Sequence, residues 1–563
     1  MSSARATRPC LTLLAVALAL IAPAAAQAKT PERTGRLLVT LDNPKHEVGV
    51  RAAAAAVLAR KDVRRDGFQV PQINLVSVRP IGGIALSALA SILRRVPGVH
   101  SVDVEHRASL RFAPNDPALT AAEPAPGTAS GTPISWWVAR SGLPAAWDVT
   151  KGDGATVAVI DTGADSGHPE LQGKIADSID NDAIAGHGPP TSDENGHGTH
   201  VASLACAAGD NGIGSVGSGL NCKLLIVKSD LGDGSIARSI VQATDRGADA
   251  INMSFGSDGG PAPQPVVDAI EYAYAKGVIL VSAADDQAVE EQGYPSNILQ
   301  PTGTGADLAA GRGLAVTAAN FLDARASFAG RGSQISLAGY GAFEGGGGPR
   351  GIFSAFPGNP TELENSGGGL LFGGEQCMCR RTFNGDSRYA YLQGTSMAAP
   401  IVAGIAAMAR HLNPDATAAD IIRALKESAS RAAGSGWNPD LGWGIINAGA
   451  AINAVRAIDR RAPESTLTGR KRIKKARSVT LKWTGADNAP GALQPAGVDV
   501  YEVYRSANRG AYRRFKRTRK LSLKVKVKPG SVYRWYTIAV DKAGNREAVP
   551  AKPDLSMRID RRR

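Results

Sequence analysis

Beyond its N-terminal stretch the chain lacks any segment apolar enough to span a bilayer, so we expect no membrane span. It also lacks the low hydrophobicity of a disordered protein, because 43% of its residues are hydrophobic and 20% are charged. With 65 Gly and 33 Pro the composition is that of a loop-rich globular protein. A length of 563 residues favours more than one domain.

A signal peptide is predicted at the N-terminus, over residues 1–28. Arg5 and Arg8 precede the apolar run Leu11–Ile21, and Ala26-Gln27-Ala28 provides small residues for cleavage. Pro23 interrupts the apolar stretch too early for a spanning helix of about 20 residues, which favours cleavage over anchoring. We therefore expect a secreted, extracellular protein.

The chain is poor in cysteine, with five residues, of which Cys10 lies in the predicted signal peptide. Four cysteines in an oxidising compartment are compatible with two disulfides. Cys206 and Cys222 bracket a Gly-rich stretch that a bond could staple, whereas a bond between Cys377 and Cys379 is expected to be strained. All three pairings stay open. A Cys metal site is disfavoured because the paired C-x-x-C spacing is missing.

Positive charge is concentrated at the C-terminal end of the chain. After Arg456 there are 28 Lys and Arg against 9 Asp and Glu, whereas the preceding residues hold 36 against 42. A single compact unit has no reason to separate charge by sequence position, so this asymmetry indicates a separate basic domain.

Three structural units are expected. Residues 29–112 alternate short strands and helices, which predicts a small α+β unit, and an Ala/Pro/Gly/Ser-rich linker follows over residues 113–133. The expected elements of this first unit are strand Arg36–Leu41, helix Val48–Lys61, strand Asn74–Arg79, helix Leu86–Arg95 and strand Val99–Glu105.

Residues 134–456 alternate β-branched runs with amphipathic stretches, which predicts an α/β unit with a parallel sheet flanked by helices. Strands are expected at Thr156–Ile160, Leu224–Lys228, Ala250–Ser254, Val278–Ser282 and Gly313–Ala318. Helices are expected at Thr199–Ala207, Ile236–Arg246, Pro265–Ala275, Ser396–His411 and Ala418–Ser428. The Gly-rich segment Gly341–Asn384 has little periodicity and is interpreted as an inserted surface loop or pair of loops.

After a basic linker over residues 457–477, residues 478–563 predict a β-sandwich. Polar and apolar residues alternate in four runs that are separated by Gly, Pro and Asn turns. The runs are Ser478–Trp483, Val498–Ser506, Ser522–Val527 and Tyr533–Asp541.

A carboxylate at the end of a buried strand is the first candidate catalytic group. The run Val157–Ile160 leads into Asp161-Thr162-Gly163 and delivers Asp161 to the carboxyl edge of the sheet, where open α/β sheets bind ligands. A turn or helix-cap Asp is an equally common use of this motif. An aspartic protease is set aside, because it needs a second carboxylate of this kind and none follows an apolar strand.

Two further motifs place polar groups at the N-termini of expected helices. His197 is flanked by glycines in Asn195–Ala202, while Ser396 lies in the small-residue turn Gly394–Pro400 before a long apolar helix. Free N–H groups and the positive end of the helix dipole favour an oxyanion near Ser396. Taken singly, a structural histidine and an N-cap serine are the commoner uses of these residues.

The three motifs in the order Asp, His, Ser resemble those of the subtilisin-like serine proteases, the subtilase family. The resemblance extends from about Trp136 to Gly442–Ala448. It implies that Ser396 attacks the scissile carbonyl, that His197 transfers its proton and that Asp161 orients the imidazole. It thus implies a serine endopeptidase that acts on protein or peptide substrates and needs no cofactor for its chemistry.

The resemblance also implies substrate-binding and oxyanion positions. Two segments would pair with an extended peptide by strand addition: Ser254, Phe255 and Gly256 on one side, and Leu231, Gly232, Asp233 and Gly234 on the other. The oxyanion hole would use Ser396 and Asp285, which stands where the family usually has Asn. An ionised Asp repels the developing negative charge, whereas a protonated one donates to it. Three outcomes therefore compete: a protonated Asp285 donor, a slow enzyme, or an inactive relative that binds peptides or cell-surface polymer. We favour the first two together.

Three accessory features follow from the same resemblance. Related proteases place calcium ligands where this chain has Asp116 and Glu170, so a structural calcium is expected there. The α+β unit resembles the family's inhibitory propeptides, with a mature N-terminus expected after Arg111. The C-terminal unit resembles a fibronectin type III domain through Tyr533–Tyr536 and Asp541–Asn545. Its basic residues could bind an anionic cell-surface polymer or only protect edge strands.

Overall fold

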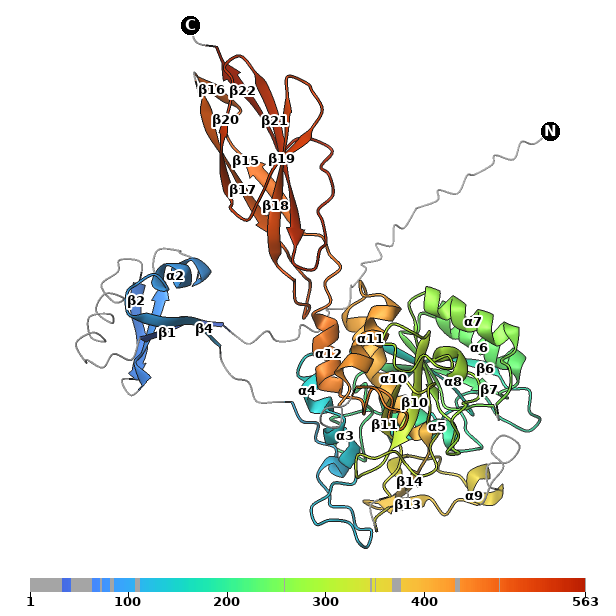
Figure 1. Ribbon diagram of the computed structural model, residues 1–563. Coiled ribbons are helices and arrows are strands. Elements are labelled where there is room, and N and C mark those ends of the chain that lie inside the picture. Colours follow the sequence, from blue (N-terminus) through green and yellow to red (C-terminus); the bar gives the residue numbers. More distant parts are fainter. Residues whose placement is uncertain are drawn as a thin grey trace, which may run out of the picture.

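The computed structural model describes residues 33–41, 63–70, 73–80, 86–106, 112–257, 259–344, 347–349, 351–366, 376–430, 436–474 and 476–561. They form an N-terminal unit, a central unit with a parallel sheet and a C-terminal unit of two sheets (Figure 1). The predicted signal peptide and the predicted helix Val48–Lys61 lie outside these ranges. Among the helices described, none is long and apolar enough to cross a membrane.

The N-terminal unit is an antiparallel sheet with the strand order β2-β3-β1-β4. Its described elements are β1 Arg33–Leu41, β2 Val63–Val70, β3 Leu75–Pro80, α2 Leu86–Leu93 and β4 Val99–His106. Leu37 and Val39 of β1 are buried in one core with Leu89 and Leu93 of α2. The sequence does not predict β2, because its charged residues and Gly67 obscure the period of two.

A seven-stranded parallel sheet with the order β11-β10-β9-β8-β5-β7-β6 forms the middle of the central unit. Its strands are β5 Thr156–Asp161, β6 Ile175–Asn181, β7 Lys223–Ser229, β8 Ala250–Met253, β9 Ile279–Ala283, β10 Gly313–Ala319 and β11 Leu337–Tyr340. The predicted α/β architecture is confirmed. The sequence misses both edge strands, because β6 is polar and partly exposed and β11, Leu-Ala-Gly-Tyr, contains no β-branched residue.

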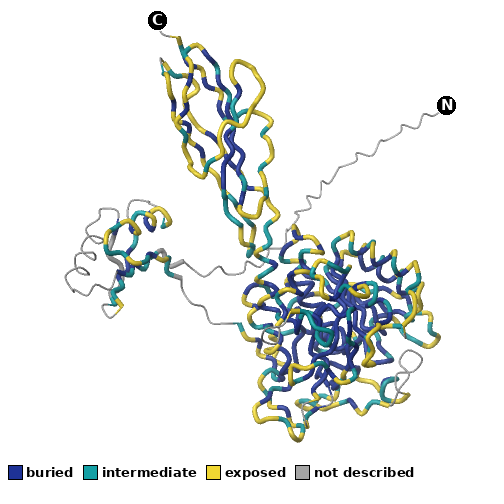
Figure 2. Tube along the Cα trace, in the orientation of Figure 1, coloured by how far each residue is buried: buried dark blue, intermediate teal, exposed yellow. Residues whose placement is uncertain are grey.

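Helices cover both faces of this sheet, because its inner strands are apolar on both sides. Val157 and Val159 of β5 belong to the core that includes α5 His197–Cys206 and α10 Thr395–Leu412. Ala158 and Ile160 instead pack with α6 Asp233–Asp245 and α7 Gln264–Ala275. The buried residues are concentrated in these layers (Figure 2). The other described helices of the unit are α3 Trp136–Arg140, α4 Leu143–Trp147, α8 Ser296–Leu299, α9 Glu362–Ser366, α11 Ala418–Ser428 and α12 Ala448–Arg456.

The segment predicted as a surface loop between Gly341 and Asn384 contains buried structure, which corrects that prediction. A small antiparallel sheet has the order β12-β14-β13, with β12 Ile352–Ala355, β13 Arg380–Phe383 and β14 Asp386–Leu392. Phe353 and Phe356 are buried, and the Ser354 hydroxyl lies 2.6 Å from the Ser203 hydroxyl of α5. Strands this short between glycines leave no period to recognise.

Both cysteine pairs of the central unit are bonded. The Cys206–Cys222 disulfide joins the end of α5 to the residue before β7, with a Cα–Cα distance of 5.6 Å. Cys377 and Cys379 form the second bond, the one for which sequence spacing predicts strain. The structure therefore selects one of the three pairings that the sequence leaves open.

The C-terminal unit consists of two sheets that share one core. The strand orders are β15-β17-β20 and β16-β22-β21-β18-β19, and the core contains Leu481, Trp483, Val503 and Trp535. The strands are β15 Glu464–Thr468, β16 Arg472–Lys474, β17 Ser478–Ala486, β18 Val498–Ala507, β19 Arg513–Thr518, β20 Ser522–Lys526, β21 Val532–Asp541 and β22 Leu555–Asp560. The basic runs of the sequence form β19 and β20, which are edge strands.

Candidate active site

The three candidate triad residues lie at the ends of regular elements. Asp161 is the last residue of β5, His197 is the first of α5, and Ser396 is the second of α10. Gly196 and Gly394, which precede α5 and α10, are packed so closely by their neighbours that a side chain would not fit at either position. A Cβ on Gly196 would lie 2.7 Å from the Phe356 ring, and one on Gly394 would lie 2.8 Å from a carboxylate oxygen of Asp286. The small residues of both motifs are therefore required by packing around the site.

Asp161 and His197 are joined by a hydrogen bond inside the protein. The distance from His197 Nδ1 to Asp161 Oδ1 is 2.8 Å, and the same oxygen accepts from the Thr162 N–H at 2.8 Å. The exposed fractions are only 2% for Asp161 and 6% for His197. This arrangement fixes the orientation of the imidazole.

The surroundings of His197 favour its protonated form. Burial alone lowers the pKa of this imidazole, but the charge and hydrogen bond of Asp161, with the charges of Asp193 and Asp286, raise it above the usual value. His200 behaves in the opposite way, because burial and the charge of His197 lower its pKa to about 3. Its Nε2 lies 3.1 Å from the Ile352 carbonyl oxygen. Of the two histidines, only His197 is suited to take up a proton near neutral pH.

Asp193 supports the site and is not identified from the sequence. Its carboxylate accepts from the N–H groups of Gly196 at 2.9 Å and Thr199 at 2.8 Å, and from the Thr162 hydroxyl at 2.8 Å. These bonds tie the loop after β5 to the first turn of α5. An acidic residue four positions before His197, at a helix N-terminus, is the signal that could have revealed this role.

Ser396 is held against the segment that follows β8. Its hydroxyl donates to the Ser254 carbonyl oxygen at 3.0 Å, and the Ser254 hydroxyl donates to the Ser396 carbonyl oxygen at 2.9 Å. Ser396 and His197 both line a cleft of about 570 Å³. The nucleophile candidate and the base candidate therefore face the same space.

The predicted substrate-binding residues do not all face this cleft. Ser254, Phe255 and Gly256 line it, as do Leu231 and Asp233, whereas Gly232 and Gly234 are not among its lining residues. Leu231 has a φ of 57°, and α6 begins at Asp233. The second half of the segment is thus helical and cannot pair as an extended strand, which corrects that part of the prediction.

Two adjacent aspartates follow β9 and line the cleft, although the sequence points only to Asp285. The carboxylate of Asp285 accepts from the Gln287 N–H at 2.8 Å. That of Asp286 accepts from the N–H of Thr395 at 2.7 Å and from its hydroxyl at 2.9 Å. Although Asp286 as a whole is exposed, protein atoms crowd its carboxylate, and the resulting loss of hydration raises its pKa. The hydrogen bonds from Thr395 act in the opposite direction but are the weaker effect. Asp286 is therefore the aspartate tied to the start of α10.

Asp116 and Glu170 are each 1% exposed, and the charge of Asp116 acts on the Glu170 carboxyl. Glu170 accepts from the Ser215 N–H at 2.7 Å and the Tyr389 hydroxyl at 3.2 Å, and burial raises its pKa to about 8. Asp116 Oδ1 is buried and accepts no hydrogen bond from the residues described. An orphaned carboxylate oxygen beside a second buried carboxylate fits a bound calcium ion, which would neutralise both.

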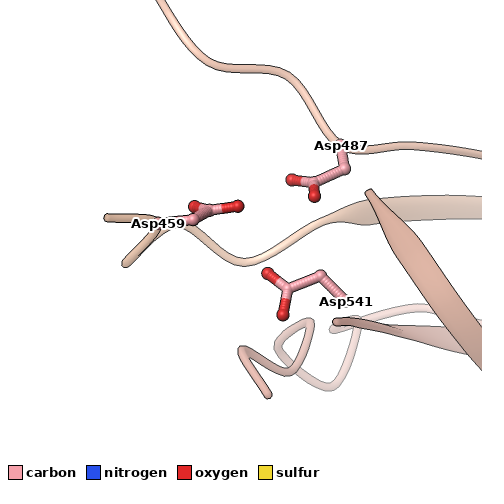
Figure 3. A group of neighbouring side chains, drawn as sticks. All are labelled: Asp459, Asp487 and Asp541. Carbon is pink, nitrogen blue, oxygen red and sulfur yellow. The ribbon is translucent and has the colours of Figure 1, made fainter. Parts of the chain in front are cut away.

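Three further aspartates meet where the central and C-terminal units join. Asp459, Asp487 and Asp541 turn their carboxylates toward a common space (Figure 3), and one oxygen of each lies within 4.8 Å of the others. Asp459 accepts from the Ala496 N–H at 2.7 Å and Asp487 from the Gly497 N–H at 2.6 Å. Burial and the charges of the other two raise the pKa of Asp487. None of the three lines the cleft.

The model of the subtilase family matches residues 152–444 of the chain. Thermitase from Thermoactinomyces vulgaris is 28% identical over 333 residues, which cover 58% of this chain and 94% of that protein. A thermophilic serine proteinase from Bacillus sp. is 33% identical over 300 residues, which cover 52% of this chain and 60% of that protein.

Two solved structures are also similar. A protease from Pseudoalteromonas arctica has 26% identity and a TM-score of 0.47, and the match covers 61% of this chain and 99% of that one. Fervidolysin from Fervidobacterium pennivorans has 20% identity and a TM-score of 0.46, and the match covers 94% of this chain and 78% of that one.

Proposed function

Since the chain belongs to the subtilase family of serine endopeptidases, we propose that Asp161, His197 and Ser396 form its catalytic triad and that the protein is secreted. The observation that carries this proposal is the 2.8 Å bond between His197 Nδ1 and Asp161 Oδ1 beside a cleft that Ser396 also lines. The positions of these side chains at the ends of β5, α5 and α10 support the roles proposed for them.

The reaction is an acyl transfer in two steps. The Ser396 hydroxyl leaves the Ser254 carbonyl oxygen, gives its proton to His197 and attacks the scissile carbonyl, forming a tetrahedral intermediate. His197 passes the proton to the departing amine, the peptide C–N bond breaks and Ser396 carries the acyl group as an ester. Water then attacks this ester with the help of His197, which returns the proton to Ser396. Asp161 stabilises the imidazolium throughout.

The developing oxyanion would be stabilised near the N-terminus of α10. Ser396 offers its backbone N–H there, and the helix dipole adds partial positive charge. Sequence position assigns the second donor to Asp285, and Asp286 is a competing candidate because it contacts Thr395. A carboxylic acid donates only while it is protonated, so this part of the site makes turnover depend on pH.

A structural calcium is proposed between Asp116 and Glu170, where it would fasten the segment before α3 to the loop that contains Asn211 and Ser215. The ion would take no part in the reaction.

The remaining assignments concern the domains. Residues 1–28 are proposed as a signal peptide and 29–112 as an inhibitory propeptide, followed by a linker over 113–133. Residues 134–456 are the proposed peptidase domain, 457–477 a basic linker and 478–563 a fibronectin type III-like domain. The alternation of the C-terminal strands and the shared core of the two sheets support the last assignment. Lys and Arg on its edge strands support binding to an anionic cell-surface polymer.

Secretion of the wild-type chain and of Ser396→Ala tests the proposal. The wild type should hydrolyse casein, lose that activity to a serine-directed inhibitor and show a mature N-terminus after Arg111 by mass spectrometry. The variant should be inert and keep its propeptide. If both proteins are equally inert while folded, the chain is a peptide-binding relative and the triad assignment fails.

A further inference from the structure

The cleft around Ser396 has an unbalanced charge. Four aspartates line it, and no Lys or Arg is among its lining residues in the described structure. The aspartates are Asp230, Asp233, Asp285 and Asp286. Among these lining residues, His197 is the one side chain that can carry a positive charge. Carboxylates are therefore in strong excess around the cleft.

Among the lining residues that the structure describes, His197 is the one basic side chain beside these carboxylates, and its charge acts on Asp286. In the parts of the chain that are described, none of the four forms an ion pair with a Lys or Arg. Each of them accepts hydrogen bonds through Oδ1. The donor is Gly232 for Asp230 and Tyr294 for Asp233. It is Gln287 for Asp285 and Thr395 for Asp286. From the residues that the structure describes, the second oxygen of each accepts no hydrogen bond.

The sheet topology places the four aspartates in two pairs. Asp230 and Asp233 follow β7, whereas Asp285 and Asp286 follow β9. In the strand order β9-β8-β5-β7, the segment after β8 with Ser254 lies between them. A peptide along this segment would therefore have Asp230 and Asp233 on one side and the candidate oxyanion donors Asp285 and Asp286 on the other.

The carboxylate of Asp233 is fixed in position by a hydrogen bond. The hydroxyl of Tyr294 donates to its Oδ1 at 2.8 Å, and both residues line the cleft. A carboxylate fixed in this way loses less conformational entropy when it pairs with a cation. The shared position of Asp230 and Asp233 on one wall adds a local negative potential.

We propose that the peptidase selects cationic polypeptide segments, with Lys or Arg side chains near the scissile bond that pair with Asp230 and Asp233 on one wall of the cleft. This inference rests on the proposed function. Attraction between opposite charges in a partly closed cleft is worth on the order of tenfold in kcat/KM.

The chain itself contains a segment of this kind. Residues 107–111, directly before the expected mature N-terminus, read Arg-Ala-Ser-Leu-Arg. This segment has two arginines and no acidic residue, so its positive charge is complementary to the negative charge of the cleft. Processing of the chain by its own active site would thus use the same preference.

Fluorogenic peptides of one sequence, with Lys, Gln or Glu on both sides of the scissile bond, test the proposal on the mature enzyme. The Lys peptide should exceed the Gln peptide by about tenfold in kcat/KM at low salt, and the Glu peptide should be the poorest. The difference should shrink in 0.5 M salt, because the attraction is screened.

Variants then assign the preference to the cleft. Asp233→Asn and Asp230→Asn should each lower the Lys-to-Gln ratio several-fold. Asp268→Asn is the matched control, because Asp268 is exposed on α7 and outside the cleft, and it should leave the ratio unchanged. Equal kcat/KM for all three peptides, or a ratio that neither cleft variant alters, would overturn the proposal. Loss of hydrolysis of every peptide and of casein would instead count against the proposed function.

Discussion

The central and C-terminal units use charge in opposite ways. In the cleft, four carboxylates lie together without a Lys or Arg among the lining residues. In the C-terminal unit the buried Glu502 binds two guanidinium groups, Arg514 at 2.8 Å and Arg546 at 2.9 Å. Burial alone raises the pKa of Glu502, but these two groups hold it below its usual value. Glu502 is thus paired with cations of its own unit, whereas the cleft carboxylates face the space that a substrate would occupy.

The difference also shows where charge affects function. Exposed ion pairs contribute about 0–1 kcal/mol each to stability, so the basic edge strands of the C-terminal unit add little to its fold. In the central unit, by contrast, the charges of Asp161, Asp193 and Asp286 act directly on His197. Changes at the cleft should therefore alter catalysis, and changes at the edge strands should alter binding to surfaces.

The largest expected effect is that of Asp161→Asn. Loss of the carboxylate removes the group that orients His197 and stabilises the imidazolium, so kcat should fall by about 10⁴-fold. Because the charge of Asp161 raises the pKa of His197, the residual activity should extend to lower pH than in the wild type. The pH profile of kcat measures both effects. A variant with nearly full kcat would show that this buried charge has no catalytic role.

The next effect concerns the two aspartates after β9. Turnover requires neutral His197, so it should rise with pH through the raised pKa of that residue. A donor carboxyl at Asp286 must be protonated, so turnover should fall as pH rises through its raised pKa. Asp286→Asn should remove the alkaline fall and raise kcat there by up to about 10²-fold, since one oxyanion donor is worth about 10²–10³.

The same measurement on Asp285→Asn separates the two candidates. If the alkaline fall disappears in that variant and persists in Asp286→Asn, the sequence-based assignment to Asp285 is the correct one. If it persists in both, neither carboxyl donates to the oxyanion.

The contrast between the units also explains what the sequence could reveal. Inner strands such as β5 are apolar on both sides and followed by Asp161, so the sheet and the position of this carboxylate are readable from the chain. Strand β6 could not be predicted from the sequence, because its edge position leaves Ala176, Asp177 and Asp180 exposed and the strand has no apolar run. The role of Asp193 depends on contacts with residues 31 and 6 positions away. Tertiary contacts of this kind leave no period in the sequence.

The resemblance to the family predicts the catalytic residues of the cleft but not the conformation of the segments that line it. The segment Leu231–Gly234 reads as a potential strand edge, whereas packing of Ile236 and Ile240 in the core begins α6 already at Asp233. The acidic character of the cleft likewise arises from the loops after β7 and β9, which are 55 residues apart between Asp230 and Asp285. Only the parallel sheet brings these loops to one edge.

A smaller effect is expected from calcium at Asp116 and Glu170. Binding of an ion to the folded state alone stabilises it by about 2.7 kcal/mol at a hundredfold excess over Kd. A chelator should therefore lower the Tm of the central unit by several degrees and leave the C-terminal unit unaffected. In Glu170→Gln the Tm should no longer respond to added calcium in calorimetry. A wild-type Tm that is equal with calcium and with chelator would contradict the site.

The smallest effect is expected at the edge strands of the C-terminal unit. Lys524 and Lys526 are exposed on β20, and replacing both by Gln in full-length Ser396→Ala should lower the salt needed for elution from a sulfated resin. Because each exposed charge contributes only a small, screened attraction, the shift should be modest, and the Tm should stay within about 1 °C. Replacing Asp230 and Asp233 by Asn instead gives the matched comparison, since it also removes two charges but from the cleft. If both double variants shift elution equally in opposite directions, net charge and not the basic edge controls the binding.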